Sequence, residues 1–513
     1  MRTILQPEPL LPRRLRRLAA ALFAVTAACG SGSSTTPSLS SRYAARCATP
    51  RAGTDSLTGA PYADRPGTVV DEKAWLRSWT DELYLWYREV PTNLDPVAYP
   101  APVTYFMALR TSALTASGRP KDRFHFTYPT DAWVALSRSG VEPGYGVTWS
   151  LLAASPPRQI VAAFVEPGSP AAVAGIARGT EVLTVDGVDV IRGADIATLN
   201  EGLFPSTAGA THSLGISDSQ GARTVVLTSA AITGAPVPIV RTLSSGGSTV
   251  GYVLFNAHVA TAEAQLIDAF RQLETAAVSD LVLDLRYNGG GYLAIASEAA
   301  FMVAGQARTA GKIFERQLFN DKAGSNDPFT GQPNRPLPFF STALGLSSAS
   351  GTALPSLGLG RVFVLSGTET CSASESIING LRGAGVQVIQ MGDTTCGKPY
   401  GFYPADNCGT TYFSIQFEGV NHQGFGDYGD GFVPGGTGTN GVPGCAVADD
   451  FSHALGDPAE GRLSAALGYR ATGTCPAGAA GVALRAQRTP PGEAEVTRPP
   501  WLQNRILGPG TAY

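Results

Sequence analysis

The chain has 513 residues, and its 38 basic and 41 acidic side chains leave a formal net charge of -3 at pH 7. That balance excludes a nucleic-acid binder that works mainly through positive charge. Hydrophobic residues make up 43 % of the chain and charged residues only 15 %, so the chain can bury an extensive core. Its length predicts about three domains of ordinary size. Only five of the basic residues are lysines, so a lysine with a chemical role comes from a short list.

Residues 1–29 are typical of a bacterial export signal. A cluster of four arginines in residues 13–17 precedes the apolar run Leu18–Ala28, which is followed by Cys29. The run is too short for a membrane span, which needs about 20 residues. Its end, Val25–Cys29, resembles a lipobox with Thr26 where leucine is usual, and this resemblance implies that Cys29 is lipidated. The protein would then be anchored to the outer membrane and face the periplasm. Simple cleavage and release, to the periplasm or outside the cell, is the alternative.

Residues 30–69 begin with glycine, serine, threonine and proline and are expected to form a flexible tether. Residues 476–513 lack hydrophobic periodicity and are expected to form a loose C-terminal tail. Six cysteines remain beyond Cys29, an even number that suits disulfide bonds in an oxidising compartment. Their short spacing favours a bond between Cys396 and Cys408. No CxxC pair occurs, which argues against a structural zinc site.

Residues 70–137 read as a small N-terminal helical domain. The spacing of Trp75, Trp79, Leu83 and Trp86 places large apolar side chains on one helical face. Aromatic residues at this density more often form a core than a ligand cage. Prolines between residues 91 and 102 predict a loop that interrupts the helices.

Residues 140–232 change to short β-branched runs separated by glycine and proline. Strands are predicted at 160–165 and 181–185, with a short helix at 171–174. The segment resembles a PDZ domain, a module that adds an extended peptide to its sheet edge while loop N–H groups bind the terminal carboxylate. A PDZ-like spacer that binds nothing is the alternative. The resemblance implies a carboxylate-binding loop formed by Gly144, Tyr145, Gly146 and Val147.

From residue 249 strands alternate with helices, which predicts an α/β layer structure. The long stretch 320–360, rich in glycine, proline and serine, reads as an insertion or lid. The expected strands are 250–255, 280–285, 361–365 and 383–391, and the expected helices are 262–273 and 374–381.

Three short motifs carry the chemistry: Leu283–Gly291, Thr370–Glu375 and the pair Gly397-Lys398. In this order, behind a PDZ-like segment, they resemble the C-terminal processing peptidases, the serine-lysine or tail-specific family S41. The resemblance implies that residues 233–475 form an α/β core related to the spiral folds of crotonase and Clp protease. It also implies an exported serine endopeptidase in which Ser372 is the nucleophile and Lys398 the general base. Its partners would be polypeptides with C-terminal or unfolded segments. This chemistry needs no metal and no cofactor.

The residues themselves support the same roles. A strand, a turn and then a helix place Ser372 at a helix N-terminus, where free N–H groups and the helix dipole favour a developing oxyanion. The N–H of Ala373 is one expected donor, and Gly290 or Gly291 offers the second because glycine allows a close approach of the backbone. Lys398 has largely apolar neighbours in sequence, and burial would lower its pKa enough for it to act as a base.

Several alternatives compete with this reading. Ser372-x-x-Glu375 is also a helix capping box, and 392–398 imitates a phosphate loop, although Pro399 replaces the residue that would hold magnesium. Five scattered histidines give no positive evidence for a Ser-His-Asp triad. Many family members carry glutamine where this chain has Phe402, so another residue must orient the lysine. This departure leaves open a catalytically weak or inactive peptide-binding scaffold on the same fold.

Overall fold

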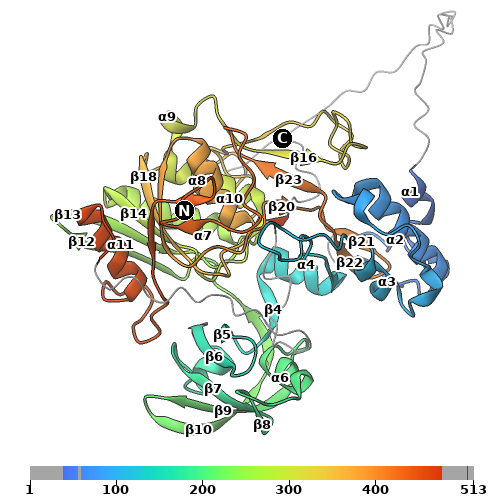
Figure 1. Ribbon diagram of the computed structural model, residues 1–513, viewed down its shortest axis with the longest axis horizontal. Coiled ribbons are helices and arrows are strands. Elements are labelled where there is room, and N and C mark those ends of the chain that lie inside the picture. The colour runs from blue at the N-terminus through green and yellow to red at the C-terminus, as the bar shows by residue number, and fades with distance from the viewer. Residues whose placement is uncertain (1–37, 56–58, 477–504, 507–513) are drawn as a thin grey trace, which may run out of the picture. The chain divides into compact units, whose positions relative to one another are not determined.

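The computed structural model describes residues 38–55, 59–476 and 505–506 (Figure 1). The expected signal peptide and Cys29 lie outside the described residues, as does most of the expected C-terminal tail. Within the described ranges, none of the helices combines the length and the apolar character that a membrane span requires.

A six-stranded sheet forms the centre of the structure, which confirms the predicted α/β layer character. Its first strand, β12, is antiparallel to β13, and the other neighbours are parallel. The predicted strands at 250–255, 280–285 and 361–365 lie in this sheet, whereas the strand predicted at 383–391 begins only at Gln387, because a helix extends to Gly383. In spatial order the strands are β12 (Ile239–Ser245), β13 (Ser248–Leu254), β14 (Asp280–Asp284), β18 (Arg361–Ser366), β19 (Gln387–Gly392) and β26 (Gly444–Ala446).

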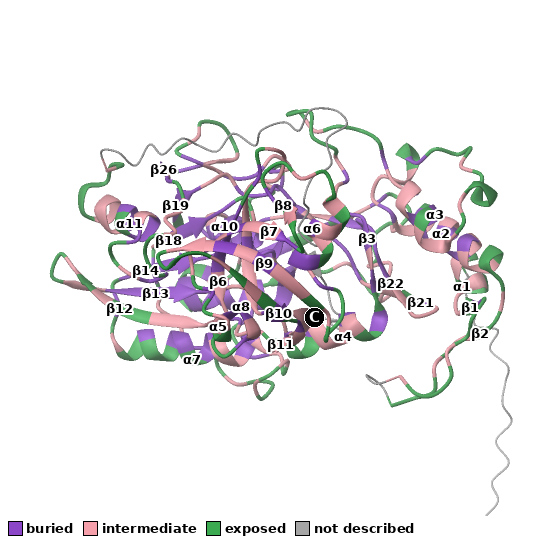
Figure 2. Cartoon of the chain, turned by 90° about the horizontal axis from the view of Figure 1, so that it is seen from below, coloured by how far each residue is buried: buried purple, intermediate pink, exposed green. Residues whose placement is uncertain are grey.

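Helices cover both faces of this sheet. The helices α7 (Ala262–Thr275), α8 (Leu293–Ala304) and α10 (Ala373–Gly383) share one apolar core with one face, and α11 (Gly461–Thr472) shares another core with the opposite face. Figure 2 shows the buried residues concentrated in the central strands and in α8 and α10. All twelve residues of α8 are buried, so this helix has no polar face, and the periodicity that reveals a surface helix is absent.

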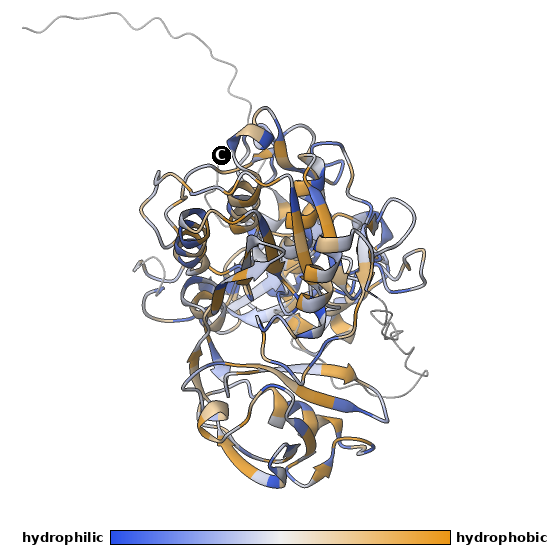
Figure 3. Cartoon of the chain, turned by 90° about the vertical axis from the view of Figure 1, so that its left-hand side faces the viewer, coloured by the Kyte–Doolittle hydropathy of each residue, from blue (hydrophilic) through white to orange (hydrophobic). Residues whose placement is uncertain are grey.

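Alternate residues of the central strands serve the two cores, as the pleat of a sheet requires. Val253, Leu283 and Val364 lie in the core with α7, α8 and α10. The residues just before them on each strand, Tyr252, Val282 and Phe363, lie in the core with α11. Figure 3 shows hydrophobic residues gathered on strands and helices, with hydrophilic residues on many of the outer loops.

The N-terminal region contains the predicted helices α2 (Val69–Leu83), α3 (Pro102–Ala108) and α4 (Thr130–Ser139). Trp75 and Trp79 on α2 are buried and stack with ring centroids 5.3 Å apart, so they are core residues, as expected. The same apolar cluster contains Cys371, Cys396 and Phe402. The N-terminal helices therefore pack directly against the segments that carry the predicted dyad.

The expectation of a flexible tether over residues 30–69 is wrong from residue 39 onward. Leu39–Tyr43 forms the helix α1, and β1 (Arg46–Cys47) pairs with β2 (Arg65–Pro66). Cys47 forms a disulfide with Cys408 across 361 residues of sequence. The glycine- and serine-rich composition ends before this helix, and a cross-link to so distant a partner leaves no local pattern in the sequence.

Residues 141–233 form a separate small sheet with its own apolar core. Strands at 160–165 and 181–185 are present as predicted. The segment is closed at its base by β4 (Val141–Gly144) and β11 (Ala230–Thr233), which pair antiparallel. In spatial order the strands are β10 (Gly221–Thr228), β9 (Thr211–Asp218), β7 (Glu181–Val185), β6 (Gln159–Val165) and β5 (Val147–Ala153), and the helices of the segment are α5 (Pro170–Val173) and α6 (Ile196–Leu203).

A polar network joins this segment to the central sheet. Arg178 donates to the hydroxyl of Tyr287 at 2.6 Å and to the carboxylate of Asp449 at 2.7 Å. Asp449 also pairs with the fully buried Arg286, which binds Glu460 as well. Tyr287 belongs to the motif Leu283–Gly291, so Arg178 connects residues 141–233 to that motif.

The stretch 320–360, expected as an insertion or lid, is mostly loop but is tightly held. The buried carboxylate of Glu263 on α7 accepts four backbone N–H groups from it. The donors are Leu344, Gly345, Ser347 and Ser348, at 2.7 to 3.1 Å.

Candidate active site

The three predicted motifs meet at one edge of the central sheet. They follow the neighbouring parallel strands β14, β18 and β19, whose registers pair Asp284 with Leu365 and Ser366 with Gly392. Carboxyl ends of parallel strands lie at the same edge, which is where α/β proteins place their sites. The strand order thus brings together segments that are up to 115 residues apart in sequence.

Hydrogen bonds join the three loops to one another. Thr370 donates through its hydroxyl to the carbonyl of Leu285 at 2.8 Å. The N–H of Cys371 donates to the carbonyl of Asn288 at 3.1 Å, and the N–H of Cys396 donates to the carbonyl of Thr370 at 3.0 Å. The segments of Ser372 and Lys398 are therefore fixed against each other by their backbones.

Ser372 is fully buried and directly precedes α10. Its backbone has a φ of +61°, a left-handed conformation that costs energy in any residue other than glycine and that often marks functional positions. Its hydroxyl has no hydrogen-bond partner, whereas its N–H donates to Glu375 at 2.9 Å. Of the two capping-box bonds, only the one from the Ser372 N–H to Glu375 is therefore present. Helix capping does not explain why a serine hydroxyl is buried here.

Lys398 lies in an apolar environment on the loop after β19, which is hydrogen-bonded to the loop of Ser372. It is fully buried, and its Nζ lies 4.8 Å from the ring centroid of Phe124 and 4.4 Å from that of Phe402. Burial lowers the pKa of Lys398 well below its usual value, although the carboxylates of Asp122 and Glu375 oppose that shift. The lysine thus has the environment that a neutral general base requires.

Several polar residues near this lysine were not predicted from the sequence. Asp122 is fully buried and accepts hydrogen bonds from the hydroxyl of Tyr84 at 2.7 Å and from the N–H of Phe124 at 3.1 Å, with His125 Nδ1 3.3 Å away. Burial opposes ionisation, but these partners hold the pKa of Asp122 below its usual value. The neighbouring Arg123 donates to the carbonyls of Cys396 and Gly397. These residues precede the dyad by some 250 positions or more, and no local motif pointed to them.

Glu375 on the first turn of α10 binds both dyad segments. Its buried carboxylate accepts the N–H groups of Ser372 at 2.9 Å, Gly397 at 2.8 Å and Lys398 at 2.8 Å, and the hydroxyl of Thr395. These bonds occupy the N–H groups with which a phosphate loop would hold its anion. A strand, β20 (Tyr400–Gly401), follows the lysine instead of a helix. The phosphate-loop alternative is therefore wrong.

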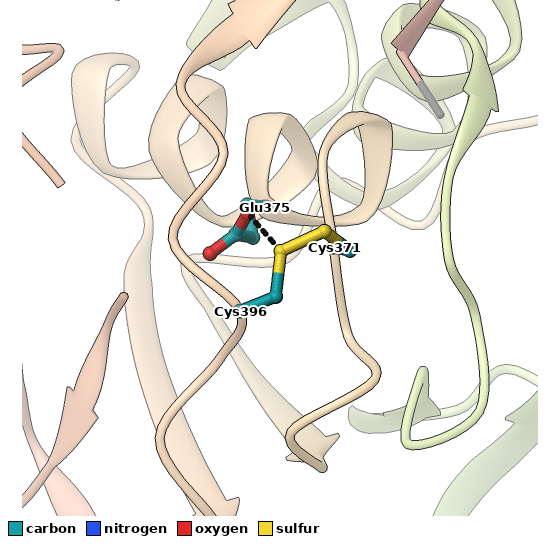
Figure 4. A group of neighbouring side chains, drawn as sticks. All are labelled: Cys371, Glu375 and Cys396. Carbon is teal, nitrogen blue, oxygen red and sulfur yellow. Dashed lines mark hydrogen bonds between the residues drawn. A yellow bond between two sulfur atoms is a disulfide. The ribbon is translucent and has the colours of Figure 1, made fainter. Parts of the chain in front are cut away.

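A disulfide joins Cys371 to Cys396 beside this glutamate (Figure 4). The predicted bond between Cys396 and Cys408 is wrong, because Cys408 lies in the turn that faces Cys47. The remaining bond joins Cys445 to Cys475. Among the described residues, the group Cys371, Glu375 and Cys396 has a spacing that could hold a metal ion, but both sulfur atoms are bonded to each other and neither is a thiolate.

The predicted oxyanion donors lie at the same edge. The N–H of Gly290 donates to the side chain of Asn288 at 3.0 Å, which makes Gly291 the stronger of the two glycine candidates. Gly291 has a φ of +139°, and a Cβ there would lie 2.3 Å from the carbonyl oxygen of His258, so only glycine fits. Ala373 is the first residue of α10, where the N–H groups of a helix lack partners within the helix.

A cavity of about 220 Å³ extends from these glycines to the predicted carboxylate-binding loop. Its lining includes all four loop residues, Gly144–Val147, together with Gly290 and Gly291. His258 also lines it. This imidazole is fully buried, burial lowers its pKa to about 3, and its Nε2 has no partner. At the same place β15 (Gly291–Tyr292) pairs in parallel with a strand from the distant C-terminal region, Arg505–Ile506.

Comparison with known proteins agrees with this geometry. The sequence profile of peptidase family S41 matches residues 249–401, and that of the S41 N-terminal domain matches residues 71–128. The chain thus contains two regions that match peptidase family S41, its peptidase domain and its N-terminal domain. The matched S41 region contains Gly290, Gly291, Ser372 and Lys398, and the N-terminal match contains Asp122.

Individual proteins are similar to parts of this chain. A carboxyl-terminal-processing protease from Picosynechococcus sp. is 28 % identical over 240 residues, which cover 45 % of this chain and 49 % of that protein. The match spans about half the length of this relative. The crystal structure of a Bacteroides fragilis protein described as an S41 protease has a TM-score of 0.55 and 24 % identity, covering 78 % of this chain and 97 % of that one. This likeness supports the mixed α/β fold. The photosystem II D1 C-terminal processing protease gives a TM-score of 0.42 at 21 % identity, covering 71 % of this chain and 90 % of that one.

Proposed function

We propose that this S41 protein is a serine endopeptidase that hydrolyses peptide bonds in polypeptides through a Ser372–Lys398 dyad. Two features together carry the proposal. The hydroxyl of Ser372 is buried without a hydrogen-bond partner, and the amine of Lys398 is buried with a pKa well below its usual value. The two lie on loops that are hydrogen-bonded to each other and cross-linked. A nucleophile and a neutral base at the carboxyl edge of a parallel sheet are the parts that acyl transfer requires.

In the proposed reaction, Ser372 Oγ attacks the scissile carbonyl carbon while Lys398 Nζ takes the hydroxyl proton. The N–H groups of Gly291 and Ala373 stabilise the oxyanion of the tetrahedral intermediate. The intermediate then collapses, the C–N bond breaks, and the ammonium of Lys398 returns its proton to the leaving amine. Water hydrolyses the remaining acyl-enzyme by the same steps in reverse order. Asp122, which carries a lowered pKa near the lysine, stabilises the transient ammonium charge.

We further propose that residues 140–232 act as a PDZ domain that recruits the substrate. The cavity that joins the loop Gly144–Val147 to Gly290 and Gly291 supports this role, because one extended polypeptide could contact both. The export signal and Cys29 lead us to propose a lipoprotein on the periplasmic face of the outer membrane. Three disulfides agree with an oxidising compartment.

The test is cleavage of an unfolded polypeptide by the oxidised chain from Gly30 onward, beside Ser372→Ala and Lys398→Ala variants of matched thermal stability. We expect cleavage by the native chain and a loss of at least about 10³-fold in both variants. Activity that survives in both variants would rule out the dyad. A chain that binds C-terminal peptides but never cleaves them, even with residues 140–232 deleted, would support the inactive scaffold instead.

A further inference from the structure

We propose that the Cys371–Cys396 disulfide and the carboxylate of Glu375 form a clamp that positions Ser372 against Lys398, so that peptide hydrolysis requires the closed disulfide. This inference rests on the proposed peptidase function and names further residues that this function needs. The three residues are positioning residues, because none of them is placed to contact the reacting atoms.

The disulfide joins the two dyad segments close to both dyad residues. Cys371 directly precedes Ser372, and Cys396 lies two residues before Lys398. The two cysteine Cα atoms are 5.1 Å apart. Without the bond, the nucleophile and the base would sit on separate loops after separate strands, held together only by hydrogen bonds. The covalent bond limits how far these loops can move apart.

Glu375 fixes the same two segments from the other side. A single oxygen of its carboxylate, Oε2, accepts the N–H groups of both Ser372 and Lys398. The same oxygen lies 3.4 Å from Sγ of Cys396, so the disulfide and the carboxylate are in contact (Figure 4). Because both are buried, water cannot replace these bonds at low cost. The disulfide and the carboxylate therefore hold the same two segments in the same relative position.

The conformation of Ser372 explains why such a clamp is needed. A non-glycine residue with a positive φ persists only where its surroundings force it to. The hydroxyl of Ser372 has no hydrogen-bond partner that could hold it in place. Its position must come from the backbone on either side, which is held by Cys371 and by the N–H donated to Glu375.

Opening the clamp is a defined two-electron reaction. A small dithiol reduces the disulfide: its first thiolate attacks Sγ of Cys396 and releases the thiolate of Cys371. Its second thiolate then displaces Cys396 and closes a ring in the reductant. Two protein thiols form, and the dithiol is oxidised. Cys371 is fully buried and Cys396 is 6 % exposed, so reduction is expected to be slow under native conditions.

The first test compares two double variants of the oxidised chain. Cys371→Ala/Cys396→Ala removes the clamp disulfide, and Cys445→Ala/Cys475→Ala removes a disulfide that does not join the dyad loops. The bonds close loops of similar length, 25 and 30 residues, so both losses should affect unfolding similarly. We expect kcat to fall about 100-fold in the first variant with little change in KM, because the loss is one of alignment. In the second variant kcat should stay within about twofold.

The second test uses the wild-type chain and does not depend on the folding of a variant. The chain is incubated with increasing dithiothreitol, quenched by alkylation, and analysed for the reduced fraction of each disulfide and for activity. We expect activity to fall in proportion to reduction of Cys371–Cys396 and to return on reoxidation. Full activity with this disulfide reduced, or equal kcat in both double variants, would overturn the clamp alone. An oxidised wild-type chain without hydrolysis would overturn the peptidase proposal and the clamp with it.

Discussion

The two sides of the candidate site are built in opposite ways. One side, the dyad side, consists of residues 370–375 and 395–398. It is buried, is cross-linked by a disulfide, and has its backbone groups bonded between loops. The other side, the cavity side, consists of residues 288–292, the loop 144–147 and His258. It borders a cavity of about 220 Å³ and has buried polar atoms without partners, Tyr145 Oη and His258 Nε2.

The difference indicates that the dyad side carries out the reaction and that the cavity side binds the substrate. Electrostatic catalysis requires groups that are already oriented before the reaction, and the dyad side meets that condition. An unsatisfied buried polar atom costs free energy that a bound ligand can recover. The cavity side is therefore expected to gain its missing partners from the substrate, and the predictions below test each side separately.

The largest effect is expected from Lys398→Met on the dyad side. Activity should fall by at least about 10³-fold, because the proposed general base is lost while the apolar shape is kept. The same change should raise the thermal midpoint at pH 7, because a buried lysine with a lowered pKa destabilises the folded state there. Cleavage assays and calorimetry on one preparation measure both effects, and a destabilised variant would contradict the buried neutral lysine.

The pH dependence of that stability gain has a fixed sign. Between the lowered folded pKa of Lys398 and its usual value near 10.5, the unfolded chain binds more protons than the folded chain. The stability of the wild type relative to Lys398→Met therefore rises with pH across this window, and the advantage of the variant should shrink towards pH 10. Calorimetry at several pH values gives the slope, and an advantage that grows with pH would contradict the direction of the shift.

On the cavity side, Gly291→Ala should reduce kcat about 10²- to 10³-fold, as expected when an oxyanion donor is displaced. The added Cβ would meet the carbonyl of His258 at 2.3 Å, so the strand must shift. Gly187→Ala is the control, because it has a φ of +82° but nothing within 4 Å of its Cβ. Gly187→Ala introduces the backbone strain of a positive φ without a steric clash. Equal losses of activity in both variants would mean that strain, and not displacement of the oxyanion donor, lowers kcat.

Arg178→Ala tests how firmly residues 141–233 hold the cavity side. The change leaves Asp449 with one buried guanidinium fewer and should lower the free energy of unfolding by about 3 kcal/mol. Since the Tyr287 hydroxyl also loses its donor Arg178 and keeps only its bond to Asp449, the KM for a long polypeptide should rise more than that for a short peptide. Arg223→Ala removes an ion pair within the segment and should change neither KM. Equal effects of the two variants would contradict the link.

The smallest effect is expected from ending the chain at Pro476. The strand Arg505–Ile506 pairs with Gly291–Tyr292 and so occupies an edge that a substrate strand would use. Its removal should lower KM about twofold without changing kcat. Steady-state kinetics on a peptide substrate would show this, and an unchanged KM would mean that the pairing does not compete with substrate.

Much of the fold could be predicted from local patterns. The strands at 250–255, 280–285 and 361–365 are short, predominantly apolar runs, as buried parallel strands are, and the helix at 262–273 has an apolar stripe. The helix α8 is buried on all sides, shows no such stripe and was not predicted. The tether interpretation of residues 39–69 also failed, because the bond between Cys47 and Cys408 depends on tertiary structure.

The candidate site, like the fold, was predictable in its local motifs and not in its distant contacts. The motifs around Gly291, Ser372 and Lys398 could be assigned from sequence, and strand order brings them to one edge of the sheet. The surroundings of the lysine could not, because Asp122 and Phe124 come from a distant domain that contacts the site only after folding. Disulfide pairing failed for a related reason, since sequence spacing does not report distance in space.

The most direct test of the central claim is to find which residue an acylating fluorophosphonate modifies, and how the rate depends on pH. The account predicts one adduct, on Ser372, formed faster as the pH rises through a value far below the usual lysine pKa, and no comparable reaction in Lys398→Met. An adduct on another residue, or an unchanged rate in Lys398→Met, would contradict the dyad.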